Sequence, residues 1–156
     1  MVNDFAEWFD FSFDTGSGFL GIFEKMLFMT REQLNDLGKH IIDSCIAVHK
    51  ELGPGLLESV NVYALLKEFE LRGIRAATKI AIPLYYKGHN TGKFFEIDVL
   101  IENEVIIEAK AVDIMHPVYE AQIISYLKLA DKRLGYLVNF NVPVLKDGFR
   151  RFVNNF

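Results

Sequence analysis

The stretch FEIDVLIENEVIIEAKAV, residues 95–112, decides how this chain folds. Apolar residues over 94–101 and 104–110 predict two strands, joined by a tight turn at Glu102 and Asn103. Two charged residues, Glu108 and Lys110, interrupt the second apolar run. Desolvating either charge alone costs several kcal/mol, so a buried strand rarely carries them without partners. The sequence therefore points to a polar site on this hairpin.

Folding the hairpin about Asn103 sets side chains of the two strands opposite each other. A spacing of two places Glu108 and Lys110 on one face, and the register predicts Asp98 opposite Glu108 and Glu96 opposite Lys110. Carboxylates at that distance, about 5 Å between Cβ atoms, repel unless a proton or cation lies between them. Such oxygens suit Mg²⁺ or Mn²⁺, and Lys110 could hold an attacking water or neutralise a phosphate oxygen. The alternative is an ordinary ion-pair cluster on a solvated sheet face.

The sequence on either side of the hairpin predicts an α/β fold in the order α-α-β-β-β-α-β. Thr30 is a good helix cap, Pro83 favours an edge strand, and Pro117 opens a helix. The almost wholly apolar residues 134–140 indicate an interior strand, and residues 143–156 carry the weakest pattern. The expected elements are helices over 30–52, 56–72 and 117–129, strands over 80–84, 94–101, 104–110 and 134–140, and a turn over 87–93.

Length and composition fit a single globular domain. The chain has 156 residues, of which 51% are hydrophobic and 24% charged, which excludes disordered and low-complexity classes. Its one cysteine, Cys45, allows neither an internal disulfide nor a Cys-rich zinc site. A reducing, cytoplasmic setting is the expectation. Cys45 and His49 are interpreted as packed helix residues.

Charge is unevenly distributed along the chain. Residues 1–28 have a net charge of −4 and hold seven of the fourteen phenylalanines. We interpret them as an N-terminal aromatic and acidic extension, either without a role in the chemistry or docking on a partner or on its own domain. They lack the features of a signal peptide, and no run is long enough to span a membrane. Residues 29–156 are neutral, with a charge of +3 confined to 110–156, so only this last part is expected to approach phosphates.

Four colinear blocks, over 49–59, 95–112, 120–130 and 135–154, resemble the GxxExxY proteins of the PD-(D/E)XK nuclease superfamily. They read HKELGPGLLES, FEIDVLIENEVIIEAKAV, EAQIISYLKLA and GYLVNFNVPVLKDGFRRFVN. The resemblance covers essentially all of 29–156, which we take as the nuclease-like domain. It implies a restriction-endonuclease-like αβββαβ core, a mixed β-sheet flanked by helices, and divalent-metal-dependent phosphodiester cleavage.

The resemblance also assigns roles to individual residues. It implies catalytic roles for four charged side chains, and it implies that Gln122 and Tyr126 orient the substrate. One departure stands at Asn61, where the family has a tyrosine; Asn61 lies beside Glu58 on the helix and can still hydrogen-bond. The implied catalytic set is Glu58, Asp98, Glu108 and Lys110, and the implied metal ligands are Asp98, Glu108, the Ala109 carbonyl and Glu58.

The leading hypothesis is a Mg²⁺- or Mn²⁺-dependent nuclease acting on nucleic acid, with DNA the expected substrate. The sequence leaves open a homodimer or a partner protein, and it predicts no membrane association. Two alternatives stay open: an inactive nuclease-fold module that binds nucleic acid or protein, and a hydrolase of another phosphoester.

Overall fold

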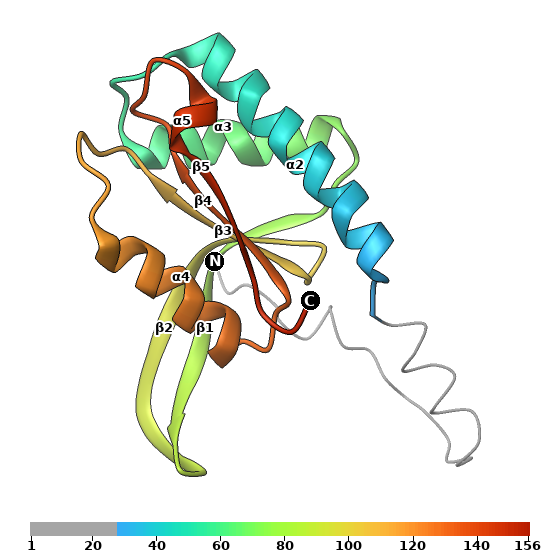
Figure 1. The fold of residues 1–156 in the computed structure, drawn as a ribbon, viewed down its shortest axis with the longest axis vertical. Coiled ribbons are helices and arrows are strands. Elements are labelled where there is room, and N and C mark those ends of the chain that lie inside the picture. The colour runs from blue at the N-terminus through green and yellow to red at the C-terminus, as the bar shows by residue number, and fades with distance from the viewer. Residues whose placement is uncertain (1–27) are drawn as a thin grey trace.

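Two helices lead into a five-stranded mixed sheet, and a third helix lies on the sheet's other side (Figure 1). The computed structural model describes residues 28–156. Its elements are α2 (Arg31–Leu52), α3 (Glu58–Leu71), β1 (Ala76–Tyr86), β2 (His89–Ile101), β3 (Val105–Lys110), α4 (Pro117–Leu129), β4 (Leu134–Asn139), α5 (Leu145–Gly148) and β5 (Phe149–Val153).

Helix α2 begins and ends where the sequence predicts. The Thr30 hydroxyl accepts the Gln33 amide N–H, and the Gln33 side chain accepts the Thr30 N–H, which together form a capping box. Gly53, with a φ of 70°, ends the helix. This conformation suits glycine because it has no Cβ. The following Pro54 and Gly55 turn the chain toward α3, which begins at Glu58 rather than at the expected residue 56.

The strand order β1-β2-β3-β4-β5 combines antiparallel and parallel pairs. β1, β2 and β3 form an antiparallel meander, β4 runs parallel to β3 after the α4 crossover, and β5 returns antiparallel to β4. The segment from α3 to β4 therefore has the expected αβββαβ order in a mixed sheet. β1 is an edge strand and β4 an interior strand, both as predicted.

Each face of the sheet has its own apolar core. On one face, α2 and α3 pack against residues that include Val99, Ile107 and Tyr136. On the other face, α4 packs through Ile123 and Leu127 on a second cluster. Cys45 is fully buried, and His49 Nε2 lies 2.7 Å from the Val142 carbonyl oxygen. Both side chains are thus packed helix residues, as interpreted from the sequence.

The expected strand over 80–84 and the expected turn over 87–93 were wrong in extent, and the expected order lacked α5 and β5; β1 covers 76–86. The predicted turn over 87–93 is confined to Lys87 and Gly88, and β2 begins at His89. The Thr91 hydroxyl donates to the Leu84 carbonyl at 2.8 Å, so the strand continues through this polar, glycine-containing stretch as a bulge. The C-terminal segment, whose pattern was weak, forms α5 and β5. Its strand is short and lies at the sheet edge, where alternation is hard to detect.

The interpretation of the N-terminal extension falls on residues 1–27, which lie outside the described part of the chain, and on Phe28. Within residues 28–156, no helix combines the length and apolar character needed to cross a membrane.

Candidate active site

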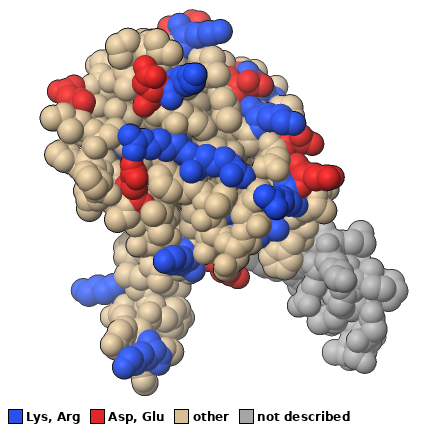
Figure 2. All heavy atoms as spheres, in the orientation of Figure 1, with Lys and Arg blue, Asp and Glu red and all other residues tan. Residues whose placement is uncertain are grey.

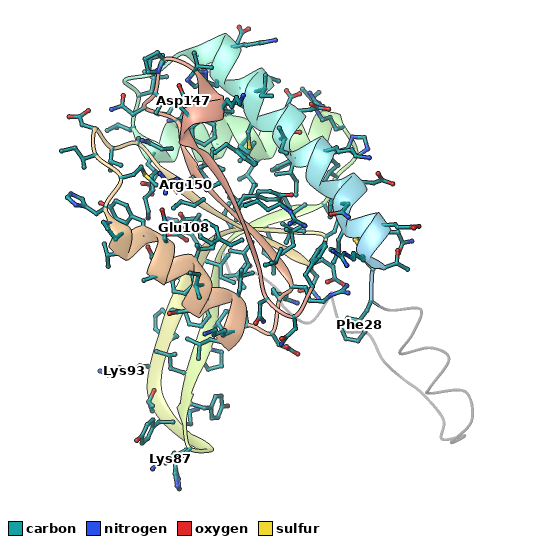
Figure 3. All side chains as sticks on the ribbon, viewed as in Figure 1. Phe28, Lys87, Lys93, Glu108, Asp147 and Arg150 are labelled. Carbon is teal, nitrogen blue, oxygen red and sulfur yellow. The ribbon has the colours of Figure 1, made fainter. Side chains whose placement is uncertain are left out.

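Glu108 and Lys110 form an ion pair on β3, which lies between β2 and β4. The Lys110 Nζ lies 2.8 Å from Glu108 Oε1, and their side chains are 12% and 2% exposed. Both residues share a face with Ile106, which belongs to the cluster under α4. Figure 3 labels Glu108 in this interior position. Because an ion pair at this depth is largely desolvated, it needs further polar partners to offset the cost.

Asp98 on β2 supplies a second carboxylate to the same place. The ladder between β2 and β3 ends at the pair Val99–Ile107, in the register that the sequence predicts. The expected pairs of Asp98 with Glu108 and of Glu96 with Lys110 lie beyond this last pair. There, Asp98 Oδ2 accepts the backbone N–H of Ala109 at 3.0 Å. The Asp98 carboxylate thus accepts the N–H of Ala109, which has no backbone partner on β2. This hydrogen bond holds Asp98 beside Glu108 and Lys110.

The β1–β2 hairpin changes direction at Asp98. Across from it, the pairing of β1 with β2 skips the position of Lys79, whose φ is 54°. On β2, Val99 belongs to the cluster under α2 and α3, whereas Ile97 belongs to the cluster under α4. These residues would share one face of a regular strand. The irregularity at Lys79 and Asp98 therefore turns the outer hairpin toward α4 and places Asp98 at the bend.

Burial shifts the pKa values of both carboxyl groups upward, and nearby acidic charges add to the shift. Burial, followed by the charge of Asp98, raises the pKa of Glu108 to about 7, although Lys110 acts against this shift. Burial is also the largest cause that raises the pKa of Asp98, against the hydrogen bond from Ala109 and the charge of Lys110. Two acids that resist ionisation at short range are typical of sites that hold a cation or exchange protons.

Glu58 reaches the same site from α3. It is the first residue of that helix, which follows the Gly53-Pro54-Gly55 turn. Burial raises the pKa of Glu58, the charge of Asp98 raises it further, and Lys110 lowers it. This mutual influence places Glu58 within electrostatic reach of Asp98 and Lys110. A hydrogen bond and an ion pair thus hold Asp98, Glu108 and Lys110 at one place, whereas Glu58 is connected to them only through these electrostatic effects.

One oxygen of this group has no partner. In the described residues, Glu108 Oε2 and Asn61 Oδ1 are the buried side-chain oxygens without a hydrogen bond. A desolvated, unpartnered carboxylate oxygen beside a second carboxylate fits a hard divalent cation such as Mg²⁺, which uses few protein ligands and keeps several waters. No group of three or more His, Cys, Asp or Glu side chains within 28–156 has the arrangement of a metal centre. The fit therefore rests on the two carboxylates of Asp98 and Glu108.

Gln122 and Tyr126 lie on one side of α4, as their spacing predicts. Gln122 Nε2 donates to Tyr126 Oη at 2.9 Å, and the Tyr126 ring stacks on Phe95 of β2 with centroids 4.3 Å apart. These contacts fix α4 against the outer hairpin. Asn61 is buried, and its amide donates to the Leu57 carbonyl at 3.2 Å. It thus braces the first turn of α3, the turn that carries Glu58.

Sequence reasoning missed two residues beside Lys110. The Tyr119 ring of α4 lies 5.1 Å from Lys110 Nζ, at a cation–π distance. Tyr119 lies three residues before Gln122 on the same helix, and this spacing could have identified it as a residue on the same side. Asn139, at the end of β4, accepts the Val112 N–H at 3.1 Å and donates to the Val112 carbonyl at 2.9 Å. A polar residue ending an apolar strand could have identified it as a support for the loop after Lys110.

A mixed sheet with αβββαβ order, carrying two acids and a lysine where β2 and β3 separate, defines a nuclease-type α/β domain. The model of the PD-(D/E)XK nuclease superfamily matches residues 35–152, and the chain belongs to this superfamily. Its members are usually nucleases and generally use divalent metals. Searches of curated proteins and of solved structures found no match.

Proposed function

We propose that this protein is a divalent-metal-dependent nuclease that hydrolyses phosphodiester bonds in DNA. The observation that carries the proposal is the convergence of Asp98, Glu108 and Lys110 in a desolvated site with one unpartnered carboxylate oxygen. An ordinary solvated ion-pair cluster would not leave that oxygen buried without a partner. The same sequence blocks support the narrower assignment to the GxxExxY proteins, with residues 29–156 as the nuclease-like domain.

Each side chain has a role that follows from its position. Asp98, Glu108 and the Ala109 carbonyl would hold Mg²⁺ or Mn²⁺, and Glu58 would assist from the start of α3. Such an ion, when bound, neutralises phosphate charge and lowers the pKa of a coordinated water. Lys110 donates from Nζ to Glu108 at 2.8 Å, so the same ammonium can orient a water for in-line attack on phosphorus.

The remaining predicted residues act on the substrate strand rather than on the reacting atoms. Gln122 and Tyr126 offer an amide and a phenol on a half-buried side of α4, held in place by their mutual hydrogen bond. We propose that they orient the nucleic-acid backbone. Asn61 does not replace a tyrosine in this role, because its amide is engaged with Leu57 inside the first turn of α3.

Cleavage of supercoiled plasmid DNA tests the proposal. We expect nicking with Mg²⁺ or Mn²⁺, none in EDTA, and at least a hundredfold loss in both Asp98→Ala and Lys110→Ala, with wild-type circular dichroism. The matched controls are Asp43→Ala and Lys50→Ala, which remove exposed charges on α2 and should cleave like wild type. Metal-dependent cleavage by both site variants at the wild-type rate would refute the assignment.

A second candidate is a nuclease-fold module that binds nucleic acid without cutting it. The observation that favours it is that no three acidic, histidine or cysteine side chains in residues 28–156 form a metal centre. Such a module would bind DNA equally well with and without EDTA and would show no cleavage with either metal. The plasmid assay and a binding titration on the same sample separate the two candidates.

A further inference from the structure

The outer half of the β1–β2 hairpin projects from the body of the protein. β2 pairs with β3 only over residues 99–101. Residues 83–94, here called the arm, therefore form a ribbon of two strands without a third neighbour. Figure 1 shows this ribbon extending beyond the end of α4, away from the other helices. A two-stranded ribbon gains little stability of its own, so its length calls for a function outside the fold.

The arm has a defined shape. Lys87 and Gly88 have φ values of 49° and 80°, which fits the tight two-residue turn that best matches strand twist. Behind the turn, the register shifts between Pro83 and Tyr85. The Asn90 side chain there accepts the Gly92 N–H at 2.8 Å. These bonds hold a narrow, twisted ribbon rather than an irregular loop.

The surface of the arm is both aromatic and basic. The side chains of Tyr85, Tyr86 and Phe94 are 58%, 67% and 64% exposed. Residues 76–95 contain three lysines and no aspartate or glutamate. In Figure 2 the arm carries lysine and no acidic side chain, and in Figure 3 Lys87 and Lys93 point away from the ribbon. Exposed aromatic groups among charges of one sign mark a surface for a partner of the opposite sign.

We propose that the arm binds duplex nucleic acid by inserting into its major groove. A groove about 12 Å wide accepts a two-stranded ribbon, and lysines on the ribbon can then contact phosphates on its rims. A second copy of this chain is a poorer partner, since two arms would bring like charges together. The inference rests on the proposed function, because it assigns the substrate of that site as a duplex.

The arm is also placed to deliver a duplex to the site. β2 runs without interruption from the arm to Asp98, and Lys93 precedes Asp98 by five residues. This corresponds to about 17 Å along an extended strand. A full turn of duplex spans about 34 Å. A duplex seated on the arm would therefore present a phosphate to Asp98 within about half a turn.

Binding measurements on the full chain test this inference. Fluorescence anisotropy in EDTA compares a labelled 24-base-pair DNA duplex, about two helical turns, with its single strand. The test variant is Lys87→Gln/Lys93→Gln. The matched control, Lys39→Gln/Lys67→Gln, removes two exposed lysines that already pair with Asp36 and Glu70. We expect about tenfold weaker duplex binding by the arm variant, a slope of log affinity against log salt reduced by about two, and a change within twofold for the control.

Three results would overturn the inference: equal duplex affinity in both double variants, an arm effect confined to the single strand, or no duplex binding by the wild-type protein. The plasmid assay run in parallel keeps this separate from the proposed activity. Duplex binding that depends on the arm lysines, without plasmid cleavage, would support the inference and refute the proposed nuclease activity. Metal-dependent cleavage together with equal duplex affinity of the two double variants would support the nuclease assignment and refute duplex binding by the arm.

Discussion

The inner and outer parts of β2 belong to one strand but lie in opposite environments. Over residues 99–101 the strand has β1 and β3 on its two sides and helices on both faces. Over residues 89–94 it pairs with β1 alone and is exposed. Asp98 lies at the bend between these parts. The strand thus connects a desolvated site to a solvated surface.

The contrast shows how the environment changes what a charged side chain can do. Lys110, at 12% exposure, is locked in an ion pair and affects the pKa values of three neighbouring acids. Lys87 and Lys93 on the arm point away from the ribbon, and Lys87 Nζ lies 5.5 Å from the centre of the exposed Tyr86 ring, so both ammonium groups lie at a solvated surface that can meet a polyanion. The same residue type is suited to chemistry in one place and to association in the other. Substitutions matched across the two parts test this difference.

The largest expected effect on stability follows removal of the buried ammonium. Lys110→Met leaves Glu108 without its partner, and breaking a buried pair costs about 3 kcal/mol or more of unfolding free energy at pH 8. At pH 5.5 the cost should be smaller, because Glu108, with a pKa of about 7, is then protonated. Lys93→Met on the arm should change stability by less than about 0.5 kcal/mol at either pH. Urea unfolding at both pH values checks this, and an equal cost for Lys110→Met at the two values would contradict it.

The pH dependence of stability is the next largest effect. Folding raises the pKa of Glu108 from 4.5 to about 7, so the folded state binds more protons in this interval. The stabilising contribution is complete below pH 4.5 and is lost as the pH rises through 7, which amounts to about 3 kcal/mol at most. Asp98 and Glu58 shift in the same direction.

Unfolding in EDTA between pH 4.5 and 7.5 measures this loss. Glu108→Gln removes the titrating group and should flatten the curve, while Mg²⁺ should stabilise the wild-type protein most at the upper end of the range. Wild-type and Glu108→Gln curves that run parallel would show that Glu108 does not titrate in this interval.

A smaller effect is expected from Asn139, which supports the site from β4. Its side chain satisfies the N–H and carbonyl of Val112 and accepts the Asn141 N–H, while the Phe140 N–H donates to the Lys110 carbonyl. Asn139→Ala removes the side-chain partners of the half-buried Val112 and Asn141 backbone groups and should lower stability by about 1–2 kcal/mol. We expect kcat to fall more than KM changes, because Lys110 loses its support. Asn139→Asp keeps the side-chain oxygen that accepts the Val112 N–H, so it should restore part of the stability and part of kcat. Unchanged kcat in Asn139→Ala would limit the residue to a structural role.

The sequence predicted the parts of the fold that depend on local pattern. Alternation over 94–110 predicted the hairpin and its register, and Pro83 predicted an edge strand. The positions of Asp98 and Glu108 followed from that register. Helix periodicity likewise predicted that Gln122 and Tyr126 would meet. These features are set by neighbours in the chain or by a single turn.

Other features depend on contacts between distant segments. The approach of Glu58 to Asp98 joins residues forty positions apart, and only the family resemblance suggested it. The Asn139–Val112 bonds join β4 to the loop after β3 across the α4 crossover. The basic arm was missed because the acids over 96–108 offset its lysines when charge is summed over 29–109. The positive charge of the arm became visible only when the lysines were placed on the surface of the folded protein.

The smallest expected effect on stability is that of Phe94→Ala, and the adjacent Phe95 of β2 provides the contrast. Phe95 is 8% exposed and stacks on Tyr126, whereas Phe94 is 64% exposed on the opposite face of the ribbon. Phe94→Ala should alter the unfolding free energy by less than about 0.5 kcal/mol, and Phe95→Ala should lower it by about 3 kcal/mol. For duplex binding the order should reverse, with several-fold weaker binding by Phe94→Ala and little change in the folded Phe95→Ala protein. Equal duplex affinity for Phe94→Ala and wild type would remove the aromatic contribution and leave the arm to act through its lysines alone.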